Sequence, residues 1–114
     1  MDLESGEPWP FARRSFDVVV VTNYLHRPLL PVLVRSVREG GLFLYETFAV
    51  GNEAYGRPKN PDYLLEAGEL LSVVQGELQV VAYEHGITRN GATSVGQRIC
   101  AMRQEAAVLV RDFR

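Results

Sequence analysis

Several side chains that can do chemistry follow a run of four valines in segment 17–31, DVVVVTNYLHRPLLP. His26 is a candidate general base, because an unperturbed imidazole titrates near pH ~6.5; the alternative is a polar loop residue or a hydrogen bond at a helix start. Arg27 can clamp a carboxylate or phosphate through two parallel N–H donors, or it is a solvated loop charge. Tyr24 can flank a flat ring or cap the core. The segment is therefore a candidate binding site.

A second polar cluster, YETFAVGNE, follows another apolar run. Glu46 lies inside LYETF, where an unpaired carboxylate would be costly. We expect it to lie at the strand mouth with a ligand or to pair with an arginine such as Arg57. Asn52, Glu53 and Arg57 belong to the long loop GNEAYGRPKNP. Such a loop is either a binding element or a connector.

Other reactive residue types are sparse. The sequence has no G-x-G-x-x-G, G-x-x-x-x-G-K-[ST] or H-E-x-x-H motif and no paired cysteines, so it predicts no metal site. The single cysteine, Cys100, lies in the apolar pattern RICAMR and is expected to be a small buried hydrophobe. Glu84 and His85 end a predicted strand, where the pattern favours surface positions.

The first predicted strand, 16–25, lacks alternation in its valines, which is typical of a strand buried on both faces. A helix is predicted over 27–39, with Val37 on its apolar face and Arg38 on the opposite face. Gly40 and Gly41 supply the stop. A second strand then covers 41–49.

A second helix is predicted over 60–76, with Asn60 as its N-cap and Pro61 in its first turn. Strands follow at 77–87 and 97–105. The order strand-helix-strand-helix-strand-strand predicts an α/β fold with a mostly parallel sheet and an antiparallel last strand.

The composition indicates one globular domain. The chain has 114 residues, of which 46% are hydrophobic and 23% charged, with a net charge of -2. We divide it into a loop at 1–15, an α/β core at 16–104 and a tail at 105–114. The charge gives no basis for binding nucleic acid, and no apolar run approaches the ~20 residues that span a bilayer. We expect a soluble, cytoplasmic protein.

The order of these motifs resembles the C-terminal half of a class I S-adenosylmethionine-dependent methyltransferase. The stretch FDVVVVTNYLHRPLLPVLVRSVREGGLFLYETFA resembles the fourth strand, the next helix and the fifth strand of that family. NPDYLLEAGELLSVVQGELQVVAYEHG is similar to a stretch of tellurite-resistance-type and related small-molecule methyltransferases, in which F/Y-x-L-x-x-G-E-L precedes a strand. QRICAMR resembles the antiparallel last strand. The resemblance covers residues 1–104.

The resemblance implies roles by matching position. It implies that DLE meets the adenine of S-adenosylmethionine and that NYLHR lines the methionine moiety and the substrate, with His26 as the catalytic base. The cofactor-binding candidates are Asp2, Leu3, Glu4, Asn23, Tyr24 and Leu25. The substrate candidates are Arg27, Tyr45, Glu46, Asn52, Arg57, His85 and Arg89.

The family begins with a strand, a G-x-G-x-G turn, a helix and a second strand, and this sequence contains none of them. Without the glycine turn we expect little or no cofactor binding by one chain, and a protein that is incomplete or inactive alone. The bare valine strand would then be covered by a second copy or by a complementary N-terminal chain. The alternative function is a non-catalytic dimerisation or regulatory module. Tellurite, thiol, amine and hydroxyl methyl acceptors all remain open.

Overall fold

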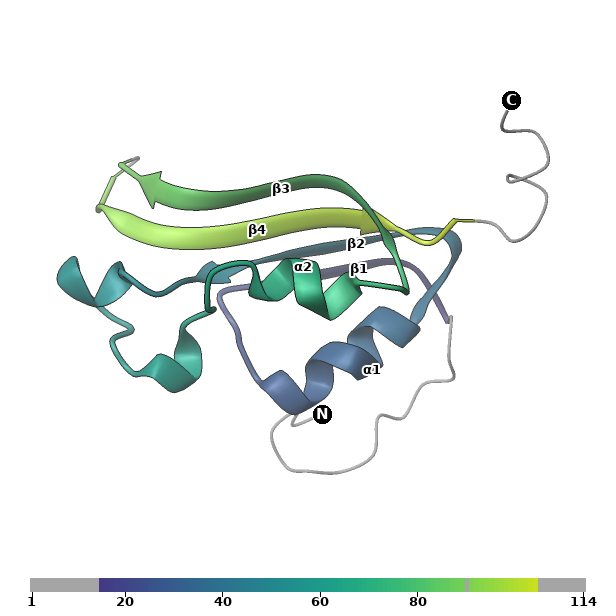
Figure 1. Cartoon of the computed structure of the whole chain (residues 1–114), viewed down its shortest axis with the longest axis horizontal. Coiled ribbons are helices and arrows are strands. Elements are labelled where there is room, and N and C mark those ends of the chain that lie inside the picture. The colour runs from purple at the N-terminus through teal and green to yellow at the C-terminus, as the bar shows by residue number, and fades with distance from the viewer. Residues whose placement is uncertain (1–14, 90, 105–114) are drawn as a thin grey trace.

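A computed structural model of the chain describes residues 15–89 and 91–104 (Figure 1). It has the α/β class that the sequence predicts. The strands are β1 (Phe16–Thr22), β2 (Val37–Phe48), β3 (Gln79–Thr88) and β4 (Ser94–Met102), and the α-helices are α1 (Leu30–Arg35) and α2 (Glu69–Val74). Single 3-10 turns cover Arg27–Leu29, Asn52–Ala54 and Pro61–Tyr63.

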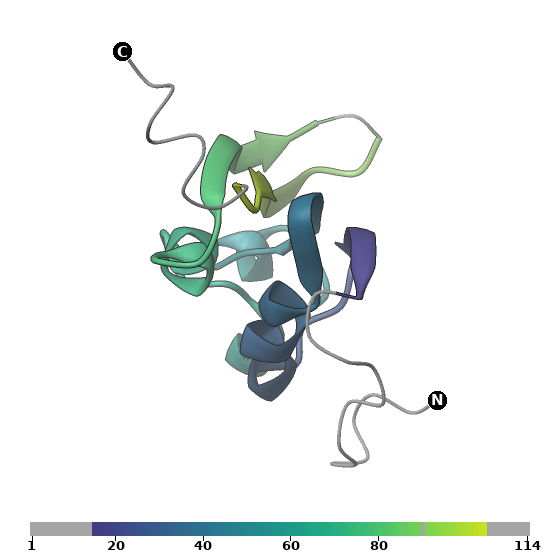
Figure 2. The same cartoon turned by 90° about the vertical axis from the view of Figure 1, so that its right-hand side faces the viewer.

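The four strands form one sheet in the order β1-β2-β4-β3. β1 and β2 are parallel, whereas β4 is antiparallel to both of its neighbours. In the view nearly along the strands, α1 and α2 lie on the same side of this sheet (Figure 2). Within the described part of the chain, β1 and β3 are thus the two edges, and one sheet face carries no helix.

The valines of β1 are buried on one face only, so the prediction of burial on both faces is wrong. Val19 is 9% exposed and points toward the helices, but Val18 and Val20 are 49% and 60% exposed. Successive strand side chains point to opposite faces, and here only one face is covered. Four identical residues carry no alternation from which a half-covered strand can be recognised.

The helix predicted over 27–39 is shorter than expected. α1 ends at Arg35, and Val37 and Arg38 already belong to β2. The carbonyl of Ser36 accepts the N–H of Phe16 at 3.0 Å, which starts the β1–β2 ladder at the point where a helix would have continued. The strand pairing therefore replaces the helical hydrogen bonds that the apolar spacing predicted.

The helix predicted over 60–76 is divided into two pieces. The side chain of Asn60 does cap a turn, by accepting the N–H of Asp62 at 2.9 Å, but that turn is the 3-10 segment Pro61–Tyr63. Leu65 then forms a parallel bridge with Ala49 directly after β2: its N–H donates to the Phe48 carbonyl at 3.0 Å, and its carbonyl accepts the Val50 N–H at 2.9 Å. A sheet pairing inside the predicted helix leaves only Glu69–Val74 for α2.

The core lies between the helices and the covered sheet face. Its sheet side is built from Phe43 and Tyr45 of β2 and Ile99 of β4, all at most 3% exposed. Among the described residues, no helix is long and apolar enough to cross a membrane.

Candidate functional site

A hollow of about 260 Å³ lies at the carboxyl ends of β1 and β2, and we call it the strand-end hollow. In open α/β sheets, ligands bind outside the carboxyl ends of the parallel strands. The hollow is lined by Asn23, Tyr24, Leu25, Thr47, Phe48, Pro58 and Tyr63. Three of these residues, Asn23 to Leu25, are among the predicted cofactor-binding candidates, and the structure places them together.

The backbone turns sharply where β1 enters this hollow. Asn23 adopts φ 54, a left-handed conformation that asparagine tolerates better than most residues, and its N–H donates to the Glu46 carbonyl at 2.9 Å. The hydroxyl of Tyr45, 2% exposed, donates to the carbonyl of Tyr24. Burial raises the pKa of Tyr45, so this hydroxyl stays a donor at neutral pH. Tyr45, a predicted substrate residue, thus supports the wall of the hollow from beneath.

Aromatic rings dominate the lining of the strand-end hollow. Tyr24, Phe48 and Tyr63 come from three separate segments and meet there, with Asn23 and Thr47 as polar neighbours. Aromatic faces stack on flat rings and attract cations. This lining suits a flat heterocycle or a positively charged sulfonium.

Arg27 binds a carboxylate of the protein itself. Its Nε lies 2.7 Å from Glu69 Oε2 and its Nη2 lies 2.9 Å from Glu69 Oε1. Nη2 also donates to the Leu64 carbonyl at 2.8 Å, and Nη1 donates to the Asp62 carbonyl at 3.2 Å. The two-pronged clamp predicted from the sequence is present, with Glu69 in the place where a substrate anion was expected; a substrate role for Arg27 stays a prediction.

Partial burial favours the neutral form of Glu69, but the hydrogen bonds from Arg27 and from the Glu66 N–H outweigh it and lower the pKa of Glu69. The same hydrogen bond with Glu69 raises the pKa of Arg27. The two groups are therefore a charged pair across the whole neutral range.

Asn52, predicted to lie on the substrate side, is 1% exposed and holds the loop together. Its Oδ1 accepts the Val95 N–H at 3.0 Å and its Nδ2 donates to the Pro58 carbonyl at 3.2 Å. Pro58 lines the strand-end hollow, so Asn52 shapes the hollow from behind. Arg57 lies in the same loop and is exposed.

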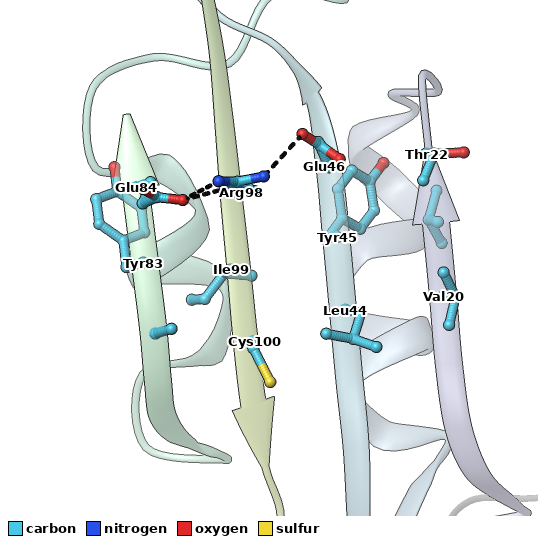
Figure 3. A pocket seen from close by; sticks show the side chains of 12 residues that line it. Val20, Thr22, Leu44, Tyr45, Glu46, Tyr83, Glu84, Arg98, Ile99 and Cys100 are labelled. Carbon is cyan, nitrogen blue, oxygen red and sulfur yellow. Dashed lines mark hydrogen bonds and ion pairs between the residues drawn. The ribbon is translucent and has the colours of Figure 1, made fainter. Parts of the chain in front are cut away.

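Glu46 lies on the sheet face that carries no helix, and its partner is not Arg57. Arg98 of β4 reaches Glu84 on β3 and, at 3.8 Å, Glu46 on β2 (Figure 3). These three side chains lie in a row across the sheet because Glu46 and Glu84 both stand directly opposite Arg98 in the strand register. The expectation that Glu46 pairs with an arginine is met by a residue of the neighbouring strand.

This row closes a second hollow, of about 270 Å³, on the same face. Its floor includes Val20, Leu44, Ala82 and Cys100, which are neighbours across the four strands. Together with Val18 we call these residues the open face. Cys100 is half-buried there.

The two histidines lie apart. His26 is half-buried at the start of the first 3-10 turn and does not line the strand-end hollow. His85 is not at a strand end, because β3 continues to Thr88, and its Nδ1 lies 3.1 Å from Nε2 of the buried Gln97. Arg89 is exposed just after β3. Of these three side chains, the structure brings none into the hollow.

Sequence reasoning missed four residues of the strand-end hollow, and the first three cofactor candidates cannot be placed. Thr47 and Phe48 end β2, so the rule that ligands bind beyond the carboxyl ends of parallel strands could have found them. Pro58 and Tyr63 carried no such signal, since they reach the hollow only by the path of the loop. Asp2, Leu3 and Glu4 lie outside the described residues. Within residues 15–89 and 91–104, no three histidine, cysteine or acidic side chains gather where they could hold a metal ion.

The described strands and helices form a methyltransferase-like α/β fold, as comparison with solved structures shows. The chain is similar to a SAM-dependent methyltransferase from Methanosarcina mazei, with a TM-score of 0.60 and 14% identity over 85% of this chain and 63% of that protein. It is also similar to a protein solved in work on the conversion of a disulfide bond into a thioacetal group during echinomycin biosynthesis, with a TM-score of 0.57 and 11% identity over 88% of this chain and 54% of that protein. No family model and no curated protein matches the sequence. The chain thus spans less than two thirds of either structure, and the likeness concerns the fold.

Proposed function

We propose that the chain is a methyltransferase-like protein related to S-adenosylmethionine-dependent small-molecule methyltransferases, of the tellurite-resistance type or close to it. The observation that carries this proposal is the strand-end hollow. Asn23, Tyr24 and Leu25, matched by resemblance to the wall beside the methionine moiety, line a hollow at the carboxyl ends of two parallel strands. A cytoplasmic location is part of the proposal.

The lining fits one part of the cofactor. Its three rings suit the adenine or the sulfonium, whereas its volume of about 260 Å³ is below the ~300–1,000 Å³ typical of sites that enclose a whole ligand of this size. When bound, S-adenosylmethionine would supply an activated methyl group for a small-molecule acceptor. The described residues would hold one end of it, so we propose that a lone chain binds it weakly and lacks activity.

His26 is the proposed base for a protonated acceptor. Its ring is half-buried at the turn that follows the hollow wall, three residues beyond Asn23. A neutral imidazole nitrogen can accept the proton that such an acceptor must lose.

A second candidate function is a dimerisation or regulatory module, and the open face favours it. Val18 and Val20 are about half exposed on an edge strand, and an apolar edge is a site for pairing with another chain. A second copy of the chain or a complementary N-terminal chain would cover them. In this version the fold is retained and the cofactor is not bound.

Titration of the purified chain with S-adenosylhomocysteine, with its mass measured in the same buffer, separates the two candidates. Binding in the micromolar range that weakens about ten-fold in Tyr63→Ala supports the methyltransferase-like function, since stacking on one ring contributes roughly 1–3 kcal/mol. Tyr55→Ala is the matched control, because Tyr55 is as exposed as Tyr63 and belongs to the same loop but does not line the hollow. A folded dimer without binding would favour the module.

A further inference from the structure

One segment beside the strand-end hollow, residues 60–65, accepts two hydrogen bonds from a single side chain, Arg27. Tyr63 lies in the 3-10 turn Pro61–Tyr63. The carbonyl oxygens of its two neighbours, Asp62 and Leu64, both accept hydrogen bonds from Arg27. The other two bonds of that guanidinium go to Glu69, in the first turn of α2. Arg27 itself follows the hollow wall formed by β1. Arg27 therefore joins the end of β1 to two neighbouring segments that lie 35 to 42 residues further along the chain.

The clamp is well suited to holding this segment. Its four contacts lie between 2.7 and 3.2 Å, and the Glu69 side chain is only 17% exposed. Charge-assisted, two-pronged pairs of this kind are stronger than ordinary hydrogen bonds and fix geometry as well. Apart from the capping bond to Asn60, the segment's own turn offers only local backbone bonds.

We infer that Arg27 and Glu69 form a latch that positions segment 60–65, and with it Tyr63, against the strand-end hollow. Arg27 does not line the hollow, so it acts on a ligand through Tyr63 and is a positioning residue. When the latch opens, Leu64 and Leu65, which are 2% and 0% exposed, still anchor the end of the segment, whereas residues 60–63 keep only the Asn60 cap and the backbone bonds of their own turn. The inference rests on the proposed function only in taking this hollow as the ligand site.

The sequence offers a probe of the latch that needs no ligand. Lys59 is the only lysine of the chain, it is exposed, and it directly precedes the latched segment. Endoproteinase Lys-C therefore has one cleavage site, and its products are residues 1–59 and 60–114. A protease cuts a folded segment when it opens locally, so the cleavage rate reports the opening equilibrium.

We expect Lys-C to cleave Arg27→Gln and Glu69→Gln about ten-fold faster than the unmodified chain under native conditions, because each variant loses a charge-assisted pair that keeps the segment closed. Arg38→Gln is the matched control, since it breaks the exposed Arg38–Asp17 ion pair (2.6 Å) at the far end of β2 and should leave the rate within about two-fold. Glu69→Asp, which keeps the charge with a shorter reach, should fall between. Urea unfolding measures the global stability of each variant, and so shows whether faster cleavage comes from global unfolding or from local opening of the segment.

Equal rates for the latch variants and the control, or a chain already cleaved as fast as an unfolded peptide, would overturn the inference. The same variants titrated with S-adenosylhomocysteine separate it from the proposed function. Faster cleavage together with weaker binding supports both. Faster cleavage in a chain that never binds the probe supports the latch and removes the methyltransferase-like function.

Discussion

Replacing Arg103 should destabilise the fold far more than replacing Arg98, although the two arginines are five residues apart along the same strand and its extension. Arg103 is 5% exposed, whereas the Arg98 side chain is 59% exposed. The guanidinium of Arg103 donates to the carbonyls of Val34 at 2.8 Å and Val37 at 2.7 Å, and pairs with Glu77 at 3.2 Å. It thereby joins the end of α1, the start of β2 and the segment after α2.

The cost follows from what Arg103→Met leaves behind. Two carbonyl oxygens at buried positions lose a charged donor, and each such loss costs about 1–3 kcal/mol. The Glu77 carboxylate is 38% exposed and can recover water, so it adds little. Methionine returns some apolar burial, which leaves a net loss of about 3 kcal/mol out of the roughly 5–15 kcal/mol expected for a domain.

The assay is urea unfolding followed by circular dichroism. With a urea m-value of about 1.5 kcal/mol/M, the midpoint of Arg103→Met should fall by about 2 M. Arg98→Met, which removes only exposed ion pairs, should cost less than about 1 kcal/mol. Equal losses for the two variants, or an Arg103→Met chain within about 1 kcal/mol of the original, would refute the reasoning.

Two further changes test the sheet and the latch. Gly41→Ala should destabilise the fold by about 1–3 kcal/mol, because a Cβ at this position would lie 2.6 Å from the Asp17 carbonyl oxygen. Gly86→Ala is the control and should be nearly neutral, since a Cβ there meets nothing within 4 Å. Similar urea midpoints for the two variants would contradict this prediction. Because the pKa of Glu69 is lower in the folded chain than its ordinary value of about 4.3, its contribution to stability is present above that pH and is lost as the pH falls through the lower folded value. The stability difference between the original chain and Glu69→Gln should therefore shrink as the pH is lowered from 6 to below the ordinary value of about 4.3, and a constant difference would argue against the pairing with Arg27.

The predicted elements show what local pattern determines. The α/β class, the existence of each strand and the capping by Asn60 all follow from residue types over short windows, where apolar spacing and turn chemistry act locally. The element ends do not. Leu65 forms a bridge with Ala49 inside a predicted helix, and the Ser36 carbonyl accepts the Phe16 N–H where a helix should have continued. In both places a backbone hydrogen bond between distant residues replaces the helical hydrogen bond that the local sequence pattern predicted.

The site divides in the same way. The resemblance to the methyltransferase family selected Asn23, Tyr24 and Leu25 from the sequence, and the structure places them at the carboxyl end of a parallel strand, where ligands bind in open α/β sheets. No local signal distinguishes an arginine that binds a ligand from one that binds Glu69, 42 residues away.

The sequence by itself therefore determined the class of fold and the edge of the sheet at which the candidate hollow lies. Only the tertiary structure decided that Tyr63 reaches this edge, that Arg27 holds it there and that one face of the valine strand is uncovered. The reason is physical: these three facts depend on which distant segments pack together, and packing depends on the whole arrangement of surfaces in space. Local propensity acts on neighbours along the chain and contains no information about that arrangement.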